Sequence, residues 1–280
     1  MSKQKHRSQS IVGGESAQKA VDTLWQTIYA EVEEYSQQEP VLACFFHDAV
    51  LSHDTLEAAL SYNLALQLDS NILSAMTIRE VISEALAVDP DISENMRKDL
   101  TAYVERDPAC DQYCLPLLYF KGFHALQIYR VTNWLWKNNR KSLASYLQNR
   151  VSEVFSVDIH PGAKIGGGIM IDHATGLVVG ETAVIGDNVS MLHSVTLGGT
   201  GARAGDRHPK IRCGVLIAAG AKILGNIEVG EGAKIGAGSL VLEPVPPHTT
   251  VAGVPAKIVG HPSEAEPARE MDQRIEDDLD

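Results

Sequence analysis

Apolar residues recur every six positions through most of the chain beyond residue 157, and this period limits the possible folds more than any other feature. It is typical of a parallel β-helix, in which each short strand buries its apolar side only by stacking on the coil beneath it. Fourteen positions fit the period, and three hexads per triangular coil predict about five coils. They fall in three registers, with a two-residue slip after the first: Ile159, Ile165, Ile171 and Leu177; Val179, Ile185, Met191 and Leu197; Ile211, Ile217, Ile223, Val229, Ile235 and Val241.

The composition changes where the hexads begin. All sixteen aromatic residues lie between Trp25 and Phe155, whereas twenty of the twenty-three glycines lie at or beyond Gly162. Apolar residues in the first half recur at helical spacing, and Asp54 and Thr77 stand where capping boxes would start two helices. A long helix is expected from Pro116 to about Asn138. The fold class predicted is therefore α+β, with an all-helical N-terminal domain followed by a left-handed parallel β-helix.

Four regions follow from these patterns. We expect a disordered N-terminus over 1–20, a helical domain over 21–155, a hexapeptide-repeat β-helix domain over 156–262, and an acidic disordered tail over 263–280. The tail holds eight acidic residues and two arginines, so it contributes half of the excess negative charge.

Charge and hydropathy exclude several classes of partner. The chain has 24 Lys and Arg against 36 Asp and Glu, a formal charge of −12, which argues against nucleic acid or an anionic membrane as the main partner. No apolar run approaches the roughly eighteen residues of a membrane helix, and the first ten residues lack the apolar stretch of a signal peptide. A cytoplasmic protein is expected, with its four cysteines reduced.

Histidines in the repeat region require an explanation, because a β-helix packed with aliphatic and small residues does not need histidine for its structure. Asp158 precedes His173 by fifteen residues, close to the length of one coil, so the two side chains could meet. A carboxylate bound to one imidazole nitrogen leaves the other free as a base. His160 and His193 are interpreted as structural or exposed. The segment 198–210 contains no hexad position and is predicted to leave the prism as a basic loop that carries His208.

Two chemistries compete at this point. Histidines on neighbouring coils could hold a zinc ion that activates water, which would make a hydro-lyase. Alternatively, one histidine with an orienting acid could deprotonate an acceptor hydroxyl in an acyl transfer, which needs no metal.

Longer segments make a resemblance specific. DIHPGAKIGGGIMIDHATG, GGTGARAGDRHPK and PVPPHTTVAGVPAKIVG in the repeat region, with RDPACDQY and PLLYFKGFHALQIYR in the helical half, resemble the bacterial serine O-acetyltransferases. The resemblance covers roughly residues 20 to 262 and implies transfer of acetyl from acetyl-CoA to L-serine, the first step of cysteine biosynthesis. Another hexapeptide O- or N-acetyltransferase and a non-catalytic scaffold remain as alternatives.

The resemblance also implies roles for single residues. His173 would be the general base with Asp158 as its partner. Serine would be bound at four positions and coenzyme A at four more: Asp107 and Asp172 for the ammonium group, Arg207 and His208 for the carboxylate, and Gly199, Thr200, Ala219 and Lys234 for coenzyme A. No metal or prosthetic group is required by this mechanism.

Partners are implied as well. Members of this family are typically trimers or dimers of trimers joined through their helical domains, with active sites between the prisms, and are commonly inhibited by L-cysteine. In several relatives a terminal isoleucine enters the active site of O-acetylserine sulfhydrylase. This chain ends in Asp280, so that complex is doubtful.

Overall fold

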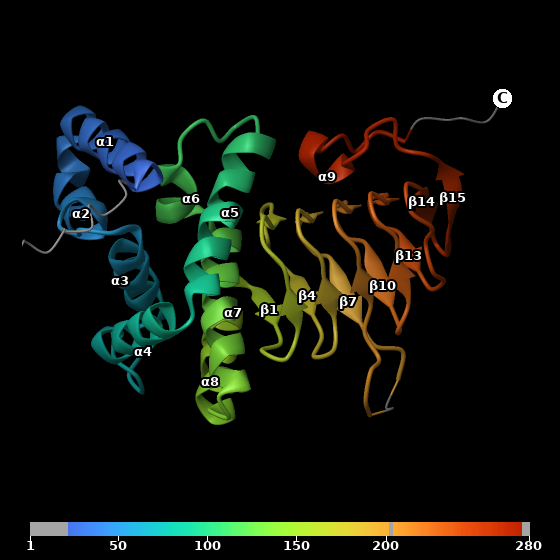
Figure 1. Ribbon diagram of the computed structural model, residues 1–280, viewed down its shortest axis with the longest axis horizontal. Helices are drawn as coiled ribbons and strands as arrows, with labels where there is room; N and C mark the ends of the chain where they lie inside the picture. Colours follow the sequence, from blue (N-terminus) through green and yellow to red (C-terminus); the bar gives the residue numbers. More distant parts are fainter. Residues whose placement is uncertain (1–21, 202–203, 276–280) are drawn as a thin grey trace, which may run out of the picture.

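The computed structural model describes residues 22–201 and 204–275, and it places the helices that precede residue 156 at one end of an elongated molecule and the strands at the other (Figure 1). The helical part contains, in order, α1 (Thr23–Gln38), η1 (Pro40–Leu42), α2 (Ala43–Phe46), the π-helical turn η2 (His47–Leu51), α3 (Leu56–Leu68), α4 (Ala75–Val88), α5 (Pro90–Arg106), α6 (Cys114–Tyr119), α7 (Lys121–Lys137) and α8 (Lys141–Phe155). No helix in this described part is long and apolar enough to cross a bilayer. The predicted disordered segment 1–20 lies outside the described residues.

Helix starts follow capping chemistry, with small shifts from the sequence prediction. The N-caps of α3 and α4 are Thr55 and Ser74, whose hydroxyls accept hydrogen bonds from Ala58 N and Thr77 N, and not Asp54 and Thr77. The helix expected from Pro116 to Asn138 is interrupted, because Phe120 is extended (φ −89°, ψ 105°) between α6 and α7. Pro116 lies in the first turn of the short helix α6, where its missing N–H costs no hydrogen bond.

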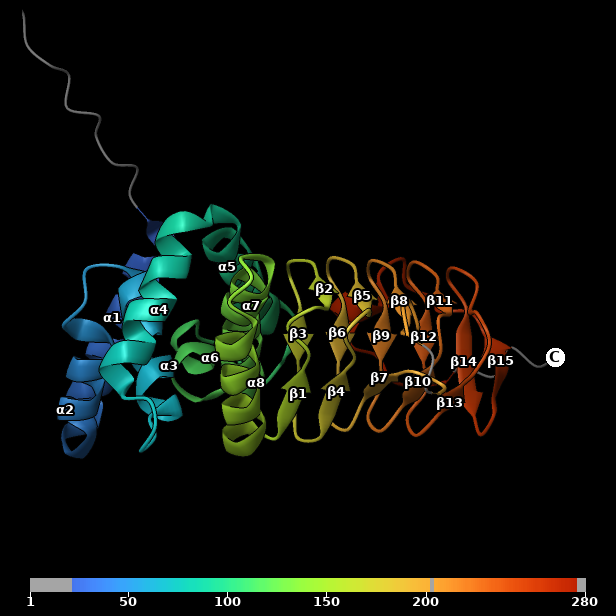
Figure 2. The ribbon, with the colours of Figure 1, turned by 90° about the horizontal axis from the view of Figure 1, so that it is seen from below.

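Strands β1 to β14 form the predicted parallel β-helix of about five coils, and β15 pairs antiparallel with β14 at its end (Figure 2). Its three sheets have the orders β1-β4-β7-β10-β13, β2-β5-β8-β11 and β3-β6-β9-β12-β14-β15. The strands are β1 (Val157–Ile159), β2 (Lys164–Ile165), β3 (Met170–Ile171), β4 (Leu177–Val179), β5 (Val184–Ile185), β6 (Ser190–Met191), β7 (Thr196–Gly198), β8 (Lys210–Ile211), β9 (Leu216–Ile217), β10 (Lys222–Leu224), β11 (Glu228–Val229), β12 (Lys234–Ile235), β13 (Leu240–Val241), β14 (Thr250–Gly253) and β15 (Ala256–Gly260).

The predicted hexad positions stack on one another. Ile159 pairs with Val179, Val179 with Leu197, and Leu197 with Ile223. The two-residue slip arises because Leu177 and Val179 lie in the same strand, β4. Leu177 pairs with Val157, two residues before the pair of Ile159 and Val179. Consequently the first coil is twenty residues long, from Ile159 to Val179, instead of eighteen.

Helical side chains cover the first coil, where β1, β2 and β3 are the edge strands of their sheets. Tyr129 Oη donates to Ala163 O (2.6 Å), Arg130 donates to Gly166 O (2.8 Å), and Ile169 N donates to the buried Asp99 carboxylate (3.0 Å). Exposed strand edges invite pairing with other chains, so this layer of side chains protects the edge and fixes the helical part against the prism.

The C-terminal segment folds back along the prism. Helix α9 (Pro267–Glu270) packs against α5 and β9, and Ala268 is fully buried. Its carbonyl accepts a hydrogen bond from Ser190 Oγ (2.8 Å). Residues 263–275 therefore differ from the disordered tail expected from charge, because two apolar residues, Pro267 and Ala268, give the acidic segment a place to dock. Residues 276–280, including Asp280, lie outside the described residues.

Candidate active site

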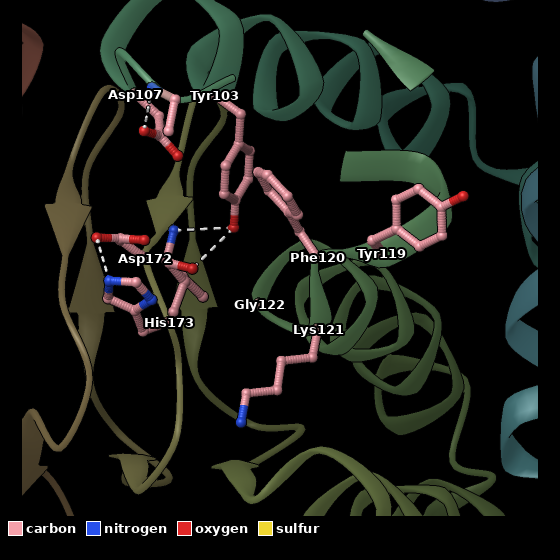
Figure 3. Close-up of a pocket in the computed structure, with 10 residues that line it drawn as sticks. Tyr103, Asp107, Tyr119, Phe120, Lys121, Gly122, Asp172 and His173 are labelled. Atoms are coloured by element: carbon pink, nitrogen blue, oxygen red, sulfur yellow. Dashed lines mark hydrogen bonds and ion pairs between the residues drawn. The ribbon is translucent and has the colours of Figure 1, made fainter. Parts of the chain in front are cut away.

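A cavity of about 470 Å³ lies where the helical part meets the first coil (Figure 3). Both domains supply its walls: Tyr103, Asp107, Ala109, Tyr119, Phe120, Lys121 and Gly122 from the helical part, and Ile171, Asp172 and His173 from the end of β3. It therefore gathers three of the predicted site residues, Asp107, Asp172 and His173.

His173 is presented by a tight left-handed turn. It and Ala174 have φ of 55° and 58°, a region that L-residues with side chains rarely adopt. Hydrogen bonds from Ala174 N to Asp172 O (2.6 Å) and from Thr175 N to His173 O (2.7 Å) close the turn. The side chain is 73% exposed, so its imidazole is open to a substrate in the cavity. Strain of this kind is concentrated at functional sites.

Two carboxylates line the cavity together with the imidazole. Asp172 Oδ2 lies 3.5 Å from His173 Nε2, and Asp107 follows the last turn of α5. Burial raises the pKa of Asp172, the nearby His173 opposes that shift, and the Asp107 charge adds to it. A partly buried pair of acids favours a cationic ligand, because a cation relieves the repulsion between them.

Asp158 has a different partner from the one predicted. Its Oδ1 accepts a hydrogen bond from Gln148 Nε2 of α8 (2.7 Å), and within the described residues no hydrogen bond or ion pair joins it to His173. The longer first coil explains this, since the residue stacked on Asp158 is Val178, five positions beyond the histidine. The pairing of Asp158 with His173 stays a prediction.

Arg207 and His208 lie at another edge of the prism. Their backbone N–H groups both donate to Thr182 Oγ1 (3.0 and 3.1 Å), in the turn between β4 and β5. Arg207 also pairs with Glu181 (2.7 Å). Burial, together with the adjacent charges of Arg207 and Lys210, lowers the pKa of His208. Thr182 N donates to His208 Nδ1 (3.2 Å), so that nitrogen is the acceptor of the neutral ring.

The two edges can now be defined. The histidine edge consists of the stacked turns 172–176, 192–195 and 218–221, joined by hydrogen bonds from Ser194 N to Thr175 O (2.8 Å) and from Gly220 N to His193 O (2.9 Å). The arginine edge consists of turn 180–183 and the residues 206–209 that bond to it. The sheet β1-β4-β7-β10-β13 runs between them, because the first edge precedes β4 and the second follows it. Within one chain, His173 and Arg207 therefore lie on opposite sides of this sheet.

The predicted coenzyme A residues are divided in the same way. Ala219 lies on the histidine edge, in the third turn counted from His173, whereas Gly199 and Thr200 follow β7 at the end of the sheet where the arginine edge lies. Lys234 is buried at the start of β12, and its Nζ donates to Arg274 O in the C-terminal segment (2.6 Å).

Several cavity residues were not identified from the sequence. Tyr103, Tyr119, Phe120 and Lys121 come from the helical half, where apolar and aromatic positions were interpreted as core. Lys121 Nζ hydrogen-bonds Thr175 Oγ1 beside the turn that carries His173. The available signal was the PLLYFKGFHALQIYR segment, which carried the resemblance but assigned no role to these residues.

His193, interpreted as structural or exposed, lies on the histidine edge with its ring 5.9 Å from that of His173. Its Nδ1 is buried and has no hydrogen-bond partner. Across residues 22–201 and 204–275, no group of three or more His, Cys, Asp or Glu is arranged to hold a metal ion.

Known families match both halves of the chain. Residues 24–128 match the model of the serine acetyltransferase N-terminal region, and residues 208–243 match that of the bacterial transferase hexapeptide with six repeats. A serine acetyltransferase from Salmonella typhimurium is 61% identical over 255 residues, covering 91% of this chain and 93% of the relative.

Solved structures agree. Serine acetyltransferase from Vibrio cholerae superposes with a TM-score of 0.89 at 63% identity, covering 90% of this chain and 98% of the other. The enzyme from Brucella abortus in complex with coenzyme A gives 0.86 at 52% identity, covering 88% and 98%. A serine acetyltransferase in complex with cysteine gives 0.88 at 57% identity, covering 90% and 98%.

Proposed function

This chain belongs to the serine acetyltransferase family and is an acyltransferase, and on that premise we propose that it acetylates the hydroxyl group of L-serine with acetyl-CoA. The products are O-acetyl-L-serine and coenzyme A, in the first step of cysteine biosynthesis. The observation that carries the proposal is the cavity in which Asp107 and Asp172 stand beside the accessible imidazole of His173.

His173 acts as the general base. Its free nitrogen takes the proton of the serine hydroxyl while the oxygen forms a bond to the acetyl carbon and the carbon–sulfur bond of the thioester breaks. The proton passes to the departing sulfur, so coenzyme A leaves as a thiol and the base is regenerated. General-base assistance of this kind contributes about 10² to 10⁴-fold, and the positioning of two bound substrates contributes further.

Serine binds through its charges. Asp107 and Asp172 take the ammonium group, whose positive charge offsets the burial and the Asp107 repulsion that together raise the pKa of Asp172. The carboxylate of serine is bound by Arg207 and His208, whose guanidinium and imidazole N–H groups suit a carboxylate. Asp158 in strand β1 orients the base in this proposal, and it would have to release Gln148 to do so.

The separation of the two edges supports an oligomer. Since His173 and Arg207 lie on opposite sides of one sheet, a complete serine site forms when the histidine edge of one copy faces the arginine edge of the next. A closed ring of three copies satisfies this head-to-tail contact. Strongly exposed apolar residues in the helical part, such as Val41, Ile72 and Met76, would then serve association of two trimers.

Coenzyme A lies along the same junction in this proposal, against Gly199, Thr200 and Ala219, and the C-terminal segment would have to release the buried Lys234 for it to take part. The complex of the Brucella abortus enzyme with coenzyme A supports acetyl-CoA as the co-substrate. The relative in complex with cysteine supports feedback inhibition by L-cysteine, which differs from serine by one atom and would compete for the same site.

The decisive experiment is release of thiol from acetyl-CoA with serine, homoserine, sugars and amines as acceptors. Serine should give the highest kcat/KM, and cysteine should raise the KM for serine. A higher kcat/KM with homoserine, a sugar or an amine would favour a different acetyltransferase on the same prism.

A further inference from the structure

The phenol of Tyr103 occupies the open edge of strand β3, directly before the catalytic turn. Its Oη donates to Ile171 O (2.9 Å) and accepts from Ile171 N (3.1 Å), as the dashed lines in Figure 3 show. One hydroxyl thus satisfies both backbone groups of the residue that precedes Asp172 and His173.

Strand β3 has a neighbouring strand on one side only. Met170 N and Asp172 N donate to Val189 O (3.1 Å) and Met191 O (2.8 Å) of the next coil, so these groups point toward β6. The N–H and C=O of Ile171 point the other way, where β3 is the last strand of its sheet. Tyr103 therefore takes the place of a missing strand at this residue.

The tyrosine is held rigidly in that position. Its side chain is 1% exposed, and its ring packs edge to face against Phe120 (5.6 Å between centroids) and Phe123 (6.2 Å). The carbonyl of Ile171 is also closed off from the other side, because a Cβ placed on Gly122 would lie 2.1 Å from that oxygen. Little room is left for a water molecule to replace the phenol.

The same face of α5 contacts successive points of the prism. Asp99 accepts from Ile169 N (3.0 Å), Tyr103 follows one turn later, and Arg106 one turn after that donates to Ser190 Oγ (3.1 Å). Positions separated by three and four residues share a helix face. Asp107, the next residue, is itself part of the cavity, so the helix that carries one acid also fixes the strand that carries the other.

We propose that Tyr103 is a positioning residue, which sets the distance between Asp107 on α5 and the Asp172–His173 pair on β3 by its double hydrogen bond to Ile171. Tyr103 transfers no proton in the reaction. This inference rests on the proposed function for its kinetic consequence, because the ammonium group of serine must meet both acids while its hydroxyl meets the imidazole.

The test compares Tyr103→Phe with Tyr129→Phe. Both variants remove one buried hydroxyl that bonds the edge of the first coil, but Tyr129 bonds Ala163, before β2 and away from the cavity. Hydrogen exchange of the peptide containing residues 169–176 should speed up in Tyr103→Phe and remain at the wild-type rate in Tyr129→Phe. The change in exchange rate tests whether the two hydrogen bonds of Tyr103 hold Ile171, without any assay of activity.

Kinetics of the folded full-length variants supply the second readout. Tyr103→Phe should lower kcat/KM for serine by about fivefold to tenfold, the effect of one or two lost hydrogen bonds, with the KM for acetyl-CoA unchanged. Tyr129→Phe should retain the wild-type values for both substrates.

Two results would overturn the inference. One is a hydrogen-exchange rate of residues 169–176 in Tyr103→Phe equal to that of the wild type, and the other is a kcat/KM for serine in Tyr103→Phe equal to that of Tyr129→Phe. Failure of the wild-type enzyme to use serine would count against the proposed function instead, while the exchange measurement would still decide whether Tyr103 holds β3.

Discussion

At the scale of single residues, the site combines an exposed imidazole with acids that are partly removed from water. His173 stands on a left-handed turn, and Asp172 beside it is the carboxylate with which it is in contact. Because burial and Asp107 disfavour the charge on Asp172, the two carboxylates repel each other, and the proposed ammonium ligand would relieve that repulsion. Binding sites often sacrifice stability in this way.

Asp172→Asn should therefore increase the thermal unfolding temperature near pH 7 while raising the KM for serine at least about tenfold, through loss of a charged hydrogen bond. The native pKa of Asp172 is raised, so the wild-type protein is stabilised by protonation of this group below the unfolded-state value and loses that contribution as the pH rises through the native value. The advantage of the variant should thus shrink on acidification.

Calorimetry of both proteins at a series of pH values measures this difference, and Asp54→Asn at an exposed surface position provides a control. An Asp172→Asn protein less stable than the wild type at pH 7 would show that the ion pair with His173 outweighs the repulsion.

At the scale of elements, close contact between α7 and β3 depends on Gly122. A Cβ at this position would lie 2.1 Å from Ile171 O, a backbone atom, so the helix or the strand would have to shift to accommodate it. Gly122→Ala should destabilise the protein by about 1–3 kcal/mol, the usual cost of overpacking, despite the better helix propensity of alanine.

Denaturant unfolding monitors that loss. Gly201→Ala, where a Cβ would meet nothing within 4 Å, should leave the free energy of unfolding unchanged. Equal stability of Gly122→Ala and the wild type would mean that α7 can move away from β3 at little cost.

The hexad period predicted the stacking of the strands because a β-helix repeats one local rule, and each anchor needs only its neighbours above and below. It could not reveal that Leu177 and Val179 share one strand, since both are apolar and point inward from β4. The first coil is therefore two residues longer than the eighteen assumed from the period, and Val178 is the residue stacked on Asp158.

Contacts between the two halves were beyond the reach of the sequence patterns. Tyr103 and Phe120 looked like core residues of a helical bundle, and only the packing of α5 and α7 against the first coil shows that they border the cavity. Asp107, Asp172 and His173 were identified through motifs, and the structure brings these three together. The docking of Ala268 was missed because the charge of the tail dominated its interpretation.

At the scale of the whole molecule, the prism carries the histidine edge and the arginine edge on opposite sides of one sheet. Figures 1 and 2 show the long β-helix standing free of the helical part along most of its length, so both edges are available to other copies. The proposed function then requires that the base and the guanidinium group at one serine site come from two chains.

Mixing two defective variants tests this sharing. His173→Ala and Arg207→Ala should each be severely impaired alone, but in a mixed ring of three one site receives both intact residues. Random co-assembly in equal amounts should restore about a quarter of the wild-type activity. If both residues served one chain's own site, co-expression would restore none, and mixing the proteins after assembly gives the control.

The most direct measurement is the turnover number of His173→Ala with serine and acetyl-CoA at saturating concentrations. If this imidazole removes the hydroxyl proton, kcat falls at least about a hundredfold while circular dichroism and the thermal unfolding temperature stay near those of the wild type. Turnover close to the wild-type value in the folded variant would contradict the account, because His173 is the residue proposed to remove the hydroxyl proton.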